Sequence, residues 1–264
     1  MLFLLTSRYG HRKVNISKVN DYYNITIYGN TETYKFMLNL FPSPRIPISN
    51  DLTSLVDIFS RKFYDYYPIK GKIVDIGGYI GDTAVYFIKK GAEFVEVYEP
   101  NPYNFELMVS NIALNNATAN IKPINSAISK NSGESVLHVS KFIAGLGSLY
   151  EIPANSITLN VNTISCQEAL NKHIDLLKMN CKGCEVDIIL NCGEKLKENI
   201  DHLIFQYTDI SENSLSIMLE KLRDLGFTID KVDRQYRMVY AQKLSTKKNH
   251  SVVFDNFIYR SNSQ

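Results

Sequence analysis

Residues 74–83 constrain the fold of this chain more than any other segment. The segment completes a short apolar run, 72–76, which suits a parallel strand buried on both faces of a sheet. Three glycines follow, and glycine allows a sharp turn with bare main chain facing a ligand. Asp82 or Thr83 can then cap a helix. This strand, glycine turn and helix predict a site for an adenosine-containing cofactor, formed by Asp75, Gly77, Gly78, Tyr79, Gly81, Asp82 and Thr83.

The turn differs from the one that binds dinucleotides. Dinucleotide folds carry G-x-G-x-x-G, so that a helix N-terminus faces a pyrophosphate. Here Ile76 occupies the position of the first glycine, and Asp75 precedes the turn. A carboxylate there would repel a pyrophosphate, but it suits the ammonium and sulfonium groups of S-adenosylmethionine, directly or through water. The sequence therefore favours S-adenosyl-L-methionine over a dinucleotide.

An acid follows at the spacing expected for a ribose ligand. Glu99 lies 18 residues beyond Gly81 (99 − 81), at the end of an apolar strand over 94–98. An acid about 20 residues after the turn is where a ribose hydroxyl pair is bound. An ordinary strand–turn–helix with a solvated Glu99 is the alternative. We assign Glu99 to the cofactor site together with Pro100, Asn101 and Asn104.

Length and charge exclude several classes of function. A chain of 264 residues can bury a sizeable core. Its net charge is +2 without a long basic run, so no nucleic-acid partner is expected. The apolar start is too short for a signal-peptide core, and no stretch approaches the ~18 apolar residues that span a bilayer. These features predict a soluble, cytoplasmic protein without a membrane span.

The four cysteines include a C-x-x-C pair, Cys181 and Cys184, besides Cys166 and Cys192. Such a pair suggests a redox or zinc site. A tetrahedral zinc site needs a second ligand pair, and the sequence has neither another C-x-x-C nor an H-x-x-x-H. A thioredoxin-like pair would follow a first strand, whereas this one falls late in the chain. We therefore predict four reduced, structural thiols and no metal.

The chain divides into an N-terminal extension, 1–69, and an α/β domain, 70–264. The extension is expected to hold a hairpin over 22–28 and 33–38, a proline-stiffened connector, and a helix capped by Asn50 or Asp51. The domain alternates strands and helices, which predicts a parallel sheet with helices on both faces. A turn-rich insertion suits a substrate lid. Domain strands are predicted near 72–76, 94–98, 120–125, 174–180, 201–207, 238–241 and 252–259, and the insertion covers 132–163.

These segments resemble the FkbM-type S-adenosylmethionine-dependent methyltransferases over roughly residues 70 to 210. The resemblance is carried by 74–83, 98–102, 125–128 with Gly133, and 175–185. In the family the end of the last segment usually reads Leu-Lys-Ile-Asp-Val-Glu-Gly-Ala-Glu, where this chain has Leu-Lys-Met-Asn-Cys-Lys-Gly-Cys-Glu. Membership implies a Rossmann-like class I fold with a mostly parallel seven-stranded sheet. It also implies methyl transfer to a hydroxyl of a small-molecule, sugar or lipid-like acceptor.

The resemblance also implies roles for individual residues. Ser126 and Ala127 would lie beside the adenine, and Asn180 would contact the cofactor. Asn180, Lys182 and Glu185 would form the catalytic group near the reactive methyl. Asn180 stands where the family usually has Asp, Lys182 where it has Glu, and Gln206 where an acid often ends the fifth strand. Each change removes a negative charge from the acceptor side.

These departures leave alternatives open. Asn180 could aim an amine acceptor at the methyl group, which would favour N- over O-methylation, or it could only order its loop. A cofactor-binding pseudo-methyltransferase with a scaffolding or sensing role is the main rival to an enzyme. A nucleotide-sugar or NAD-dependent enzyme is a weaker one. The tyrosine-rich hairpin could cover a partner subunit in a homodimer or simply cap the sheet.

Overall fold

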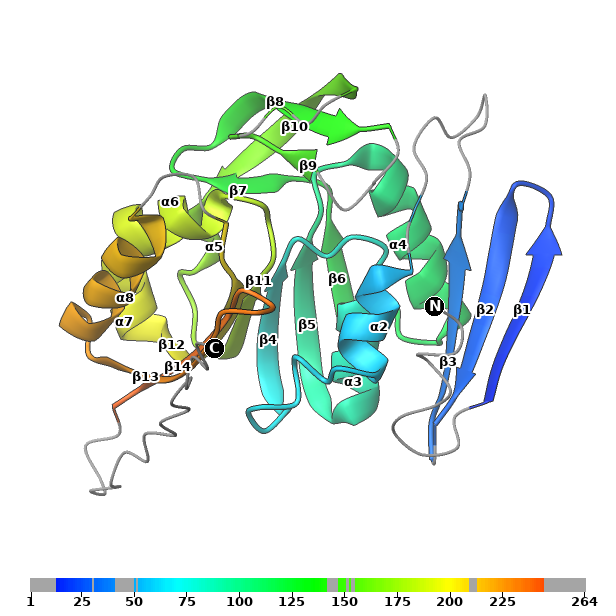
Figure 1. Ribbon diagram of the computed structural model, residues 1–264, viewed down its shortest axis with the longest axis horizontal. Helices are drawn as coiled ribbons and strands as arrows, with labels where there is room; N and C mark the ends of the chain where they lie inside the picture. The colour runs from blue at the N-terminus through cyan, green and yellow to red at the C-terminus, as the bar shows by residue number, and fades with distance from the viewer. Residues whose placement is uncertain are drawn as a thin grey trace, which may run out of the picture.

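A seven-stranded sheet forms the centre of the computed structural model (Figure 1). The structure describes residues 13–29, 31–40, 50, 52–141, 147–150, 152, 155–208 and 213–244. The strand order is β13-β14-β12-β11-β4-β5-β6, and β14 pairs antiparallel with both of its neighbours while the other pairings are parallel. This mixed sheet agrees with the predicted α/β class with a mostly parallel sheet, although one of its strands, β13, was not predicted. Its strands are β4 (Gly71–Ile76), β5 (Ala92–Tyr98), β6 (Ile121–Ile124), β11 (Ile174–Met179), β12 (Ile200–Gln206), β13 (Phe227–Asp233) and β14 (Met238–Lys243).

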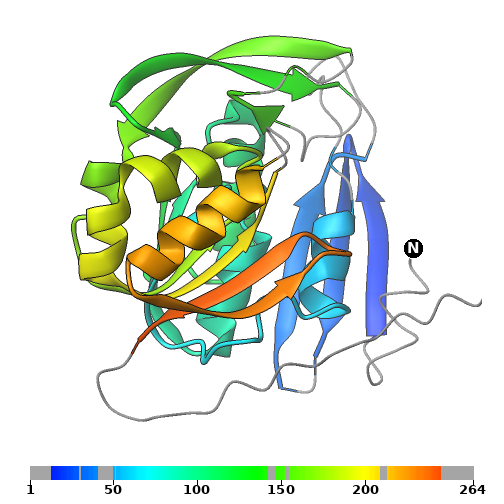
Figure 2. The same ribbon diagram turned by 60° about the vertical axis from the view of Figure 1, so that its left-hand side comes forward.

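Helices cover both faces of this sheet (Figure 2). Along β4, Ile73 belongs to one hydrophobic cluster, whereas Val74 and Ile76 belong to the other, because successive side chains of a strand point to opposite faces. Both faces are therefore buried, as the apolar run predicts. No helix in the described part of the chain is long and apolar enough to cross a membrane. One face carries α3 (Asp82–Lys90) and α4 (Pro102–Leu114); the other carries α5 (Cys166–Ala169), α6 (Cys184–Asn191), α7 (Gly193–Asn199) and α8 (Ser214–Asp224).

The N-terminal hairpin forms as predicted and gains a further strand. β1 (Lys13–Val19), β2 (Tyr22–Tyr28) and β3 (Thr33–Leu38) make an antiparallel sheet. Asn111 of α4 and Asn115, the C-cap residue of this helix, bind the main chain of β3: Asn111 Oδ1 accepts from Met37 N at 2.6 Å, and Asn115 Oδ1 accepts from Lys35 N at 3.0 Å. The extension therefore packs directly on the α/β domain, and the two share one hydrophobic cluster.

The helix of the extension, α2 (Thr53–Phe59), begins differently from the prediction. Leu52 is its N-cap, without a side-chain cap hydrogen bond. Asn50 instead accepts from Asn39 N and donates to Asn104 Oδ1, at 3.1 Å each, so its side chain joins the extension to α4. Asp51, the other predicted cap, and the proline connector at 41–47 lie outside the described residues. The predicted capping by Asn50 is therefore wrong.

The insertion forms a second sheet across the carboxyl ends of the central strands (Figure 1). The strand order is β7-β10-β8-β9. Because β8 and β10 pair along their full overlap, the insertion is more regular than its turn-rich sequence indicates. The strands are β7 (Ala127–Ser129), β8 (Gly133–Ser140), β9 (Gly147–Ser148) and β10 (Ser156–Ser165).

Two further predictions need correction. β14 pairs with β13, a strand that was not predicted because polar residues interrupt its apolar ones. The predicted strand 252–259 lies outside the described residues. The four thiols are not reduced: Cys166 bonds to Cys192, and Cys181 bonds to Cys184. The fold brings Cys166 and Cys192 together across 26 positions, and the loop after β11 bends enough to place Cys181 and Cys184 5.5 Å apart at Cα.

Candidate active site

The glycine turn between β4 and α3 fits closely against its own neighbours. Gly77 N and Gly78 N both donate to Tyr98 O on β5, at 3.0 and 2.9 Å. Gly77 has a φ of +81°, and a Cβ added there would lie 2.2 Å from Asn180 O. A Cβ on Gly78 would lie 2.1 Å from Val97 Cγ2. These glycines are therefore required by the packing of the turn, in addition to any ligand.

Glu99 closes the turn from the end of β5. Its Oε2 accepts from Tyr79 N at 2.9 Å, and its Oε1 accepts from Asn101 N at 3.0 Å. Asn101 in turn caps α4 through Oδ1, which accepts from Tyr103 N at 3.0 Å. Burial raises the pKa of Glu99 to about 7. The carboxylate is thus held in place by main-chain donors while it still faces a cavity.

Asp75 does not face that cavity. It is fully buried, and its Oδ1 accepts from Lys178 Nζ at 2.6 Å while its Oδ2 accepts from Thr83 Oγ1. Lys178 stands opposite Asp75 in the β4–β11 register and also donates to Gly77 O at 2.6 Å. The structure therefore does not support direct contact between Asp75 and a cofactor. Both oxygens of its carboxylate instead accept hydrogen bonds from the protein, one from Lys178 and the other from Thr83 in the first turn of α3. Parallel alignment of the two predicted strands could have revealed this pair.

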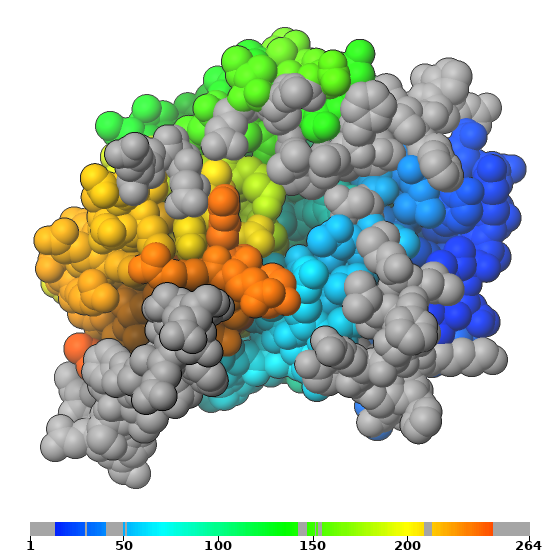
Figure 3. Space-filling model, in the orientation of Figure 1, coloured from blue at the N-terminus to red at the C-terminus, as the bar shows by residue number. Residues whose placement is uncertain are grey.

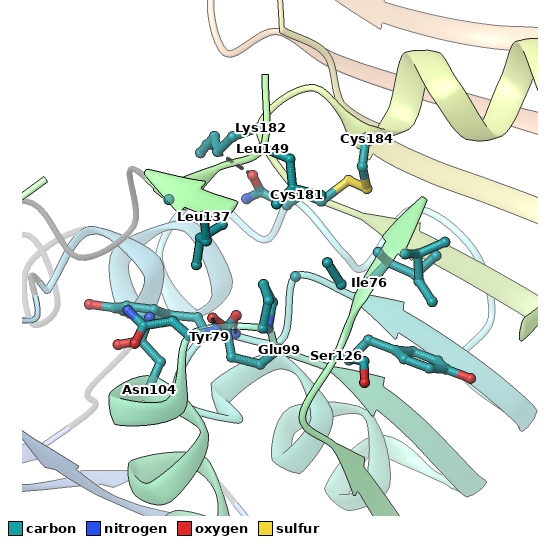
Figure 4. Close-up of a pocket in the computed structure, with 18 residues that line it drawn as sticks. Ile76, Tyr79, Glu99, Asn104, Ser126, Leu137, Leu149, Cys181, Lys182 and Cys184 are labelled. Carbon is teal, nitrogen blue, oxygen red and sulfur yellow. Dashed lines mark hydrogen bonds between the residues drawn. A yellow bond between two sulfur atoms is a disulfide. The ribbon is translucent and has the colours of Figure 1, made fainter. Parts of the chain in front are cut away.

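A cavity lies between the strand ends and the second sheet (Figure 4). Figure 4 shows Tyr79, Glu99 and Asn104 on one wall, with Leu137 and Leu149 opposite. Leu137 and Leu149 come from the insertion, and sequence reasoning did not single them out. The predicted site residues that line this first cavity are Gly77, Tyr79, Glu99, Pro100, Asn101, Asn104, Ser126, Ala127, Asn180 and Lys182.

A second cavity adjoins the first. Gly77, Tyr79, Asn180 and Lys182 line both. Asp82 and Thr83 lie here rather than in the first cavity, and burial raises the pKa of Asp82 to about 6. Gly78, Gly81 and Asp75 line neither cavity. The second cavity is therefore a separate, more polar compartment that meets the first at the end of β11.

The N-terminal extension supplies part of the second cavity. Ser54 and Asp57 of α2 and Tyr64 of the following segment line it, and no motif identifies them in the sequence. Figure 3 shows this cyan segment beside the orange β13–β14 hairpin, where Phe63 packs on Tyr236 with ring centroids 5.0 Å apart. The extension is thus part of the site. The sequence analysis treats it as a separate element and does not predict this role.

The three positions at which this chain departs from the family pattern contact one another. Lys182 Nζ donates to Asn180 Oδ1 at 2.9 Å and to Gln206 Oε1 at 2.7 Å. Gln206 also donates through Nε2 to Tyr236 O at 3.2 Å. The three departures therefore form one hydrogen-bonded group at the junction of the two cavities, with a lysine at its centre.

Glu185 does not join this group. It is fully buried, lines neither cavity, and accepts from Gly183 N through Oε2 at 3.0 Å. Burial raises its pKa. Its carboxylate binds the main chain at the N-cap of α6, so it lies against this loop rather than in a cavity. The structure gives Glu185 a role in ordering this loop, in place of the predicted position beside a reacting methyl group.

A seven-stranded sheet of this order, with a glycine turn and an acid at neighbouring strand ends, defines a Rossmann-like α/β protein. Residues 75–229, more than half of the chain, match the family model of the methyltransferase FkbM domain. The chain belongs to this methyltransferase family. A search of curated proteins found no match to the sequence.

Several solved structures are similar to this chain at low sequence identity. Methyltransferase FkbM from Methylobacillus flagellatus KT is 14% identical, with a TM-score of 0.48 over 70% of this chain and 47% of that one. This chain thus spans about half the length of that protein. TYW2 of M. jannaschii, in complex with AdoMet, is 13% identical, with a TM-score of 0.45 over 89% and 85% of the two chains. TrmK of M. capricolum, in complex with S-adenosylhomocysteine, is 11% identical, with a TM-score of 0.41 over 74% and 70%.

Proposed function

We propose that the protein is an S-adenosylmethionine-dependent methyltransferase that binds the cofactor in the first cavity and its acceptor in the second. The observation that carries the proposal is the meeting of the two cavities at Gly77, Tyr79, Asn180 and Lys182. Methyl transfer is an in-line displacement, so donor and acceptor must approach through one opening. The acceptor is a small molecule, a sugar or a lipid-like compound.

The residues of the first cavity suit the proposed cofactor. Glu99 presents a buried carboxylate for ribose hydroxyls, and the buried Nδ2 of Asn101 has no hydrogen-bond partner among the described residues. Ile128, Leu137 and Leu149 add an apolar surface for a base. A ligand with hydroxyl groups and an apolar ring would hydrogen-bond to the polar residues and pack on the apolar ones.

The cofactor, when bound, supplies an electrophilic methyl group. The chain's own contribution is then alignment and exclusion of water, which can account for about 7–11 kcal/mol of a barrier. A hydroxyl acceptor must also lose a proton, and a missing base typically costs about 10²–10⁴-fold. Asn180 cannot serve as that base, and Lys182 and Gln206 are hydrogen-bonded to each other. At the junction itself this favours an amine or amide acceptor, or an acceptor that loses its proton without help; the carboxylates of Asp57 and Asp82 in the second cavity are the other candidate bases.

The first prediction concerns this missing base. Asn180→Asp is expected to raise turnover of hydroxyl acceptors by about 10²-fold or more, because it restores a carboxylate at the junction. Transfer of labelled methyl groups to a panel of alcohols, sugars and amines measures the effect, with Asn191→Asp on the far end of α6 as a matched control. Equal turnover of hydroxyl acceptors by Asn180→Asp and wild type would contradict the amine preference.

A cofactor-binding protein without catalysis is the second candidate. The observation that favours it is the position of the Lys182 ammonium group, which donates hydrogen bonds to Asn180 and Gln206 at the junction of the two cavities. Saturable cofactor binding without transfer to any acceptor of the panel, in both wild type and Asn180→Asp, would support this scaffolding or sensing role over an enzyme.

A second prediction is the pH dependence of cofactor binding. Burial raises the pKa of Glu99 to about 7, so the carboxyl is mostly ionised near pH 8 and mostly protonated near pH 6. Ribose hydroxyls favour the ionised acceptor, so affinity for S-adenosylhomocysteine should fall as the pH falls, by about tenfold between these pH values. Calorimetric titrations at both pH values measure the change. Glu99→Gln should bind weakly and lose this dependence; an equal dependence in Glu99→Gln would assign it to another group, such as Asp82.

A further inference from the structure

The disulfide between Cys181 and Cys184 forms part of the wall of the first cavity (Figure 4). Cys181 is partly exposed, whereas Cys184 is buried. The two cysteines stand where the family segment usually has Val and Ala, so this chain differs from that pattern at both positions at once. The other disulfide, Cys166–Cys192, lies in the hydrophobic cluster and lines neither cavity.

The loop that this disulfide closes is held in an unusual backbone conformation. Lys182 has a φ of +54° and Gly183 a φ of +118°. A left-handed conformation is uncommon for a residue with a side chain, and it persists only where the surroundings impose it. Cys181 Sγ also lies 3.3 Å from Glu185 Oε2, the buried carboxylate that accepts from Gly183 N. The cross-link is thus one of the constraints that fix this loop.

The same loop connects the disulfide to the rest of the site. Lys182 O accepts from Ser148 Oγ of β9 at 2.7 Å, which ties the loop to the sheet formed by the insertion. Lys182 Nζ donates to Asn180 and Gln206 at the junction of the cavities. A change in the loop would therefore act on the wall of the first cavity and on the junction together.

We propose that Cys181–Cys184 is a reversible thiol–disulfide site, and that its reduction by a small dithiol weakens cofactor binding in the first cavity. The inference rests on the proposed function. Separate sulfurs need more room than bonded ones, and the loop loses one of its constraints. Coupling between two sites is typically about 5–150-fold; we expect affinity for S-adenosylhomocysteine to fall by about tenfold on reduction.

The chemistry is ordinary thiol–disulfide exchange. A thiolate of the dithiol attacks Sγ of Cys181, the more exposed of the two residues, and the Cys181–Cys184 bond breaks with Cys184 leaving as the thiolate. Cys184 is the first residue of α6, where the helix N-terminus stabilises a thiolate. The second thiol of the reductant then displaces Cys181, and both cysteine thiolates take up protons. The protein disulfide gains two electrons and two protons, and the dithiol loses them as it becomes a cyclic disulfide.

Calorimetric titration of S-adenosylhomocysteine into the oxidised and the dithiothreitol-reduced full-length chain tests the proposal. Mass spectrometry after thiol alkylation identifies which cysteines are reduced. Cys181→Val/Cys184→Ala, which introduces the family residues, should bind without any response to reductant. Cys166→Ala/Cys192→Ala is the matched control and should keep the response. Thermal unfolding confirms that each variant is folded.

Thermodynamic reciprocity provides an independent measurement. If reduction weakens binding tenfold, saturating S-adenosylhomocysteine must make the disulfide harder to reduce by the same factor. Its midpoint potential in a dithiothreitol redox buffer should then fall by about 30 mV.

The outcomes separate this inference from the proposed function. A tenfold difference in affinity together with the matching shift in potential supports the proposal. Equal affinity in both redox states, with Cys181 and Cys184 shown to be reduced, overturns it and leaves the proposed function standing. No saturable binding in either state, in folded protein, overturns the proposed function and this inference with it.

Discussion

Glu99→Ala is expected to abolish measurable binding of S-adenosylhomocysteine, with affinity reduced by at least about 100-fold. The variant removes the proposed acceptor for the ribose hydroxyls, and hydrogen bonds to a charged group contribute about 1.5–3 kcal/mol each. It also removes the partner of Tyr79 N and Asn101 N, so that the glycine turn and the start of α4 lose a shared anchor. Calorimetric titration of the variant and wild type measures the loss.

Glu96→Ala is the matched control for this prediction. Glu96 is also a buried acid of β5, but it lines neither cavity and is paired with Lys122 and Lys172. Its replacement should leave affinity for S-adenosylhomocysteine unchanged. Undiminished binding by a folded Glu99→Ala would contradict the assignment of Glu99 to the ribose.

Lys178→Met should cause the largest loss of stability among the site variants. The side chains of Lys178 and Asp75 are 2% and 0% exposed, and they form an ion pair with 2.6 Å between Nζ and Oδ1. Removing one partner of a buried pair leaves an uncompensated charge and costs about 3–5 kcal/mol. For a chain of this size the loss corresponds to a drop in Tm of roughly 6–20 °C. Thermal unfolding followed by circular dichroism measures it.

Two further variants distinguish the destabilisation caused by the unpaired buried charge from that caused by the loss of the lysine side chain. Asp75→Asn/Lys178→Met removes both charges and should recover a large part of the stability, because replacing a whole buried pair is often close to neutral. Lys172→Met breaks a pair whose lysine is 42% exposed and should cost no more than about 1 kcal/mol. A Tm for Lys178→Met equal to that of wild type would show that the ion pair does not stabilise the fold.

The sequence predicts the centre of this fold because the relevant signals are local. The apolar run before Gly77, the glycines and the spacing to Glu99 each lie within one strand–helix unit, and parallel strands bring their ends to one edge. The antiparallel pair is harder to predict. β13 mixes polar and apolar residues because it lies at the edge of the sheet, so its pattern is weak beside the apolar segment at 252–259.

The rest of the site depends on contacts between distant segments. Leu137 and Leu149 reach the first cavity only because β8 and β10 pair across the insertion. Ser54 and Tyr64 reach the second because the extension packs on α3 and shares its core. The partner of Asp75 lies 103 positions away, and the bond between Cys166 and Cys192 spans 26. No local pattern encodes these pairings.

The central claim is that the first cavity binds the cofactor of methyl transfer. Calorimetric titration of the wild-type chain with S-adenosylhomocysteine, checked by thermal shift, tests it most directly. We predict saturable binding at one site. At 100 times the dissociation constant the ligand should add about 2.7 kcal/mol of stability, and raise the Tm by roughly 5–10 °C. Absence of binding by the folded protein, or tight binding of NADH in its place, would contradict the account.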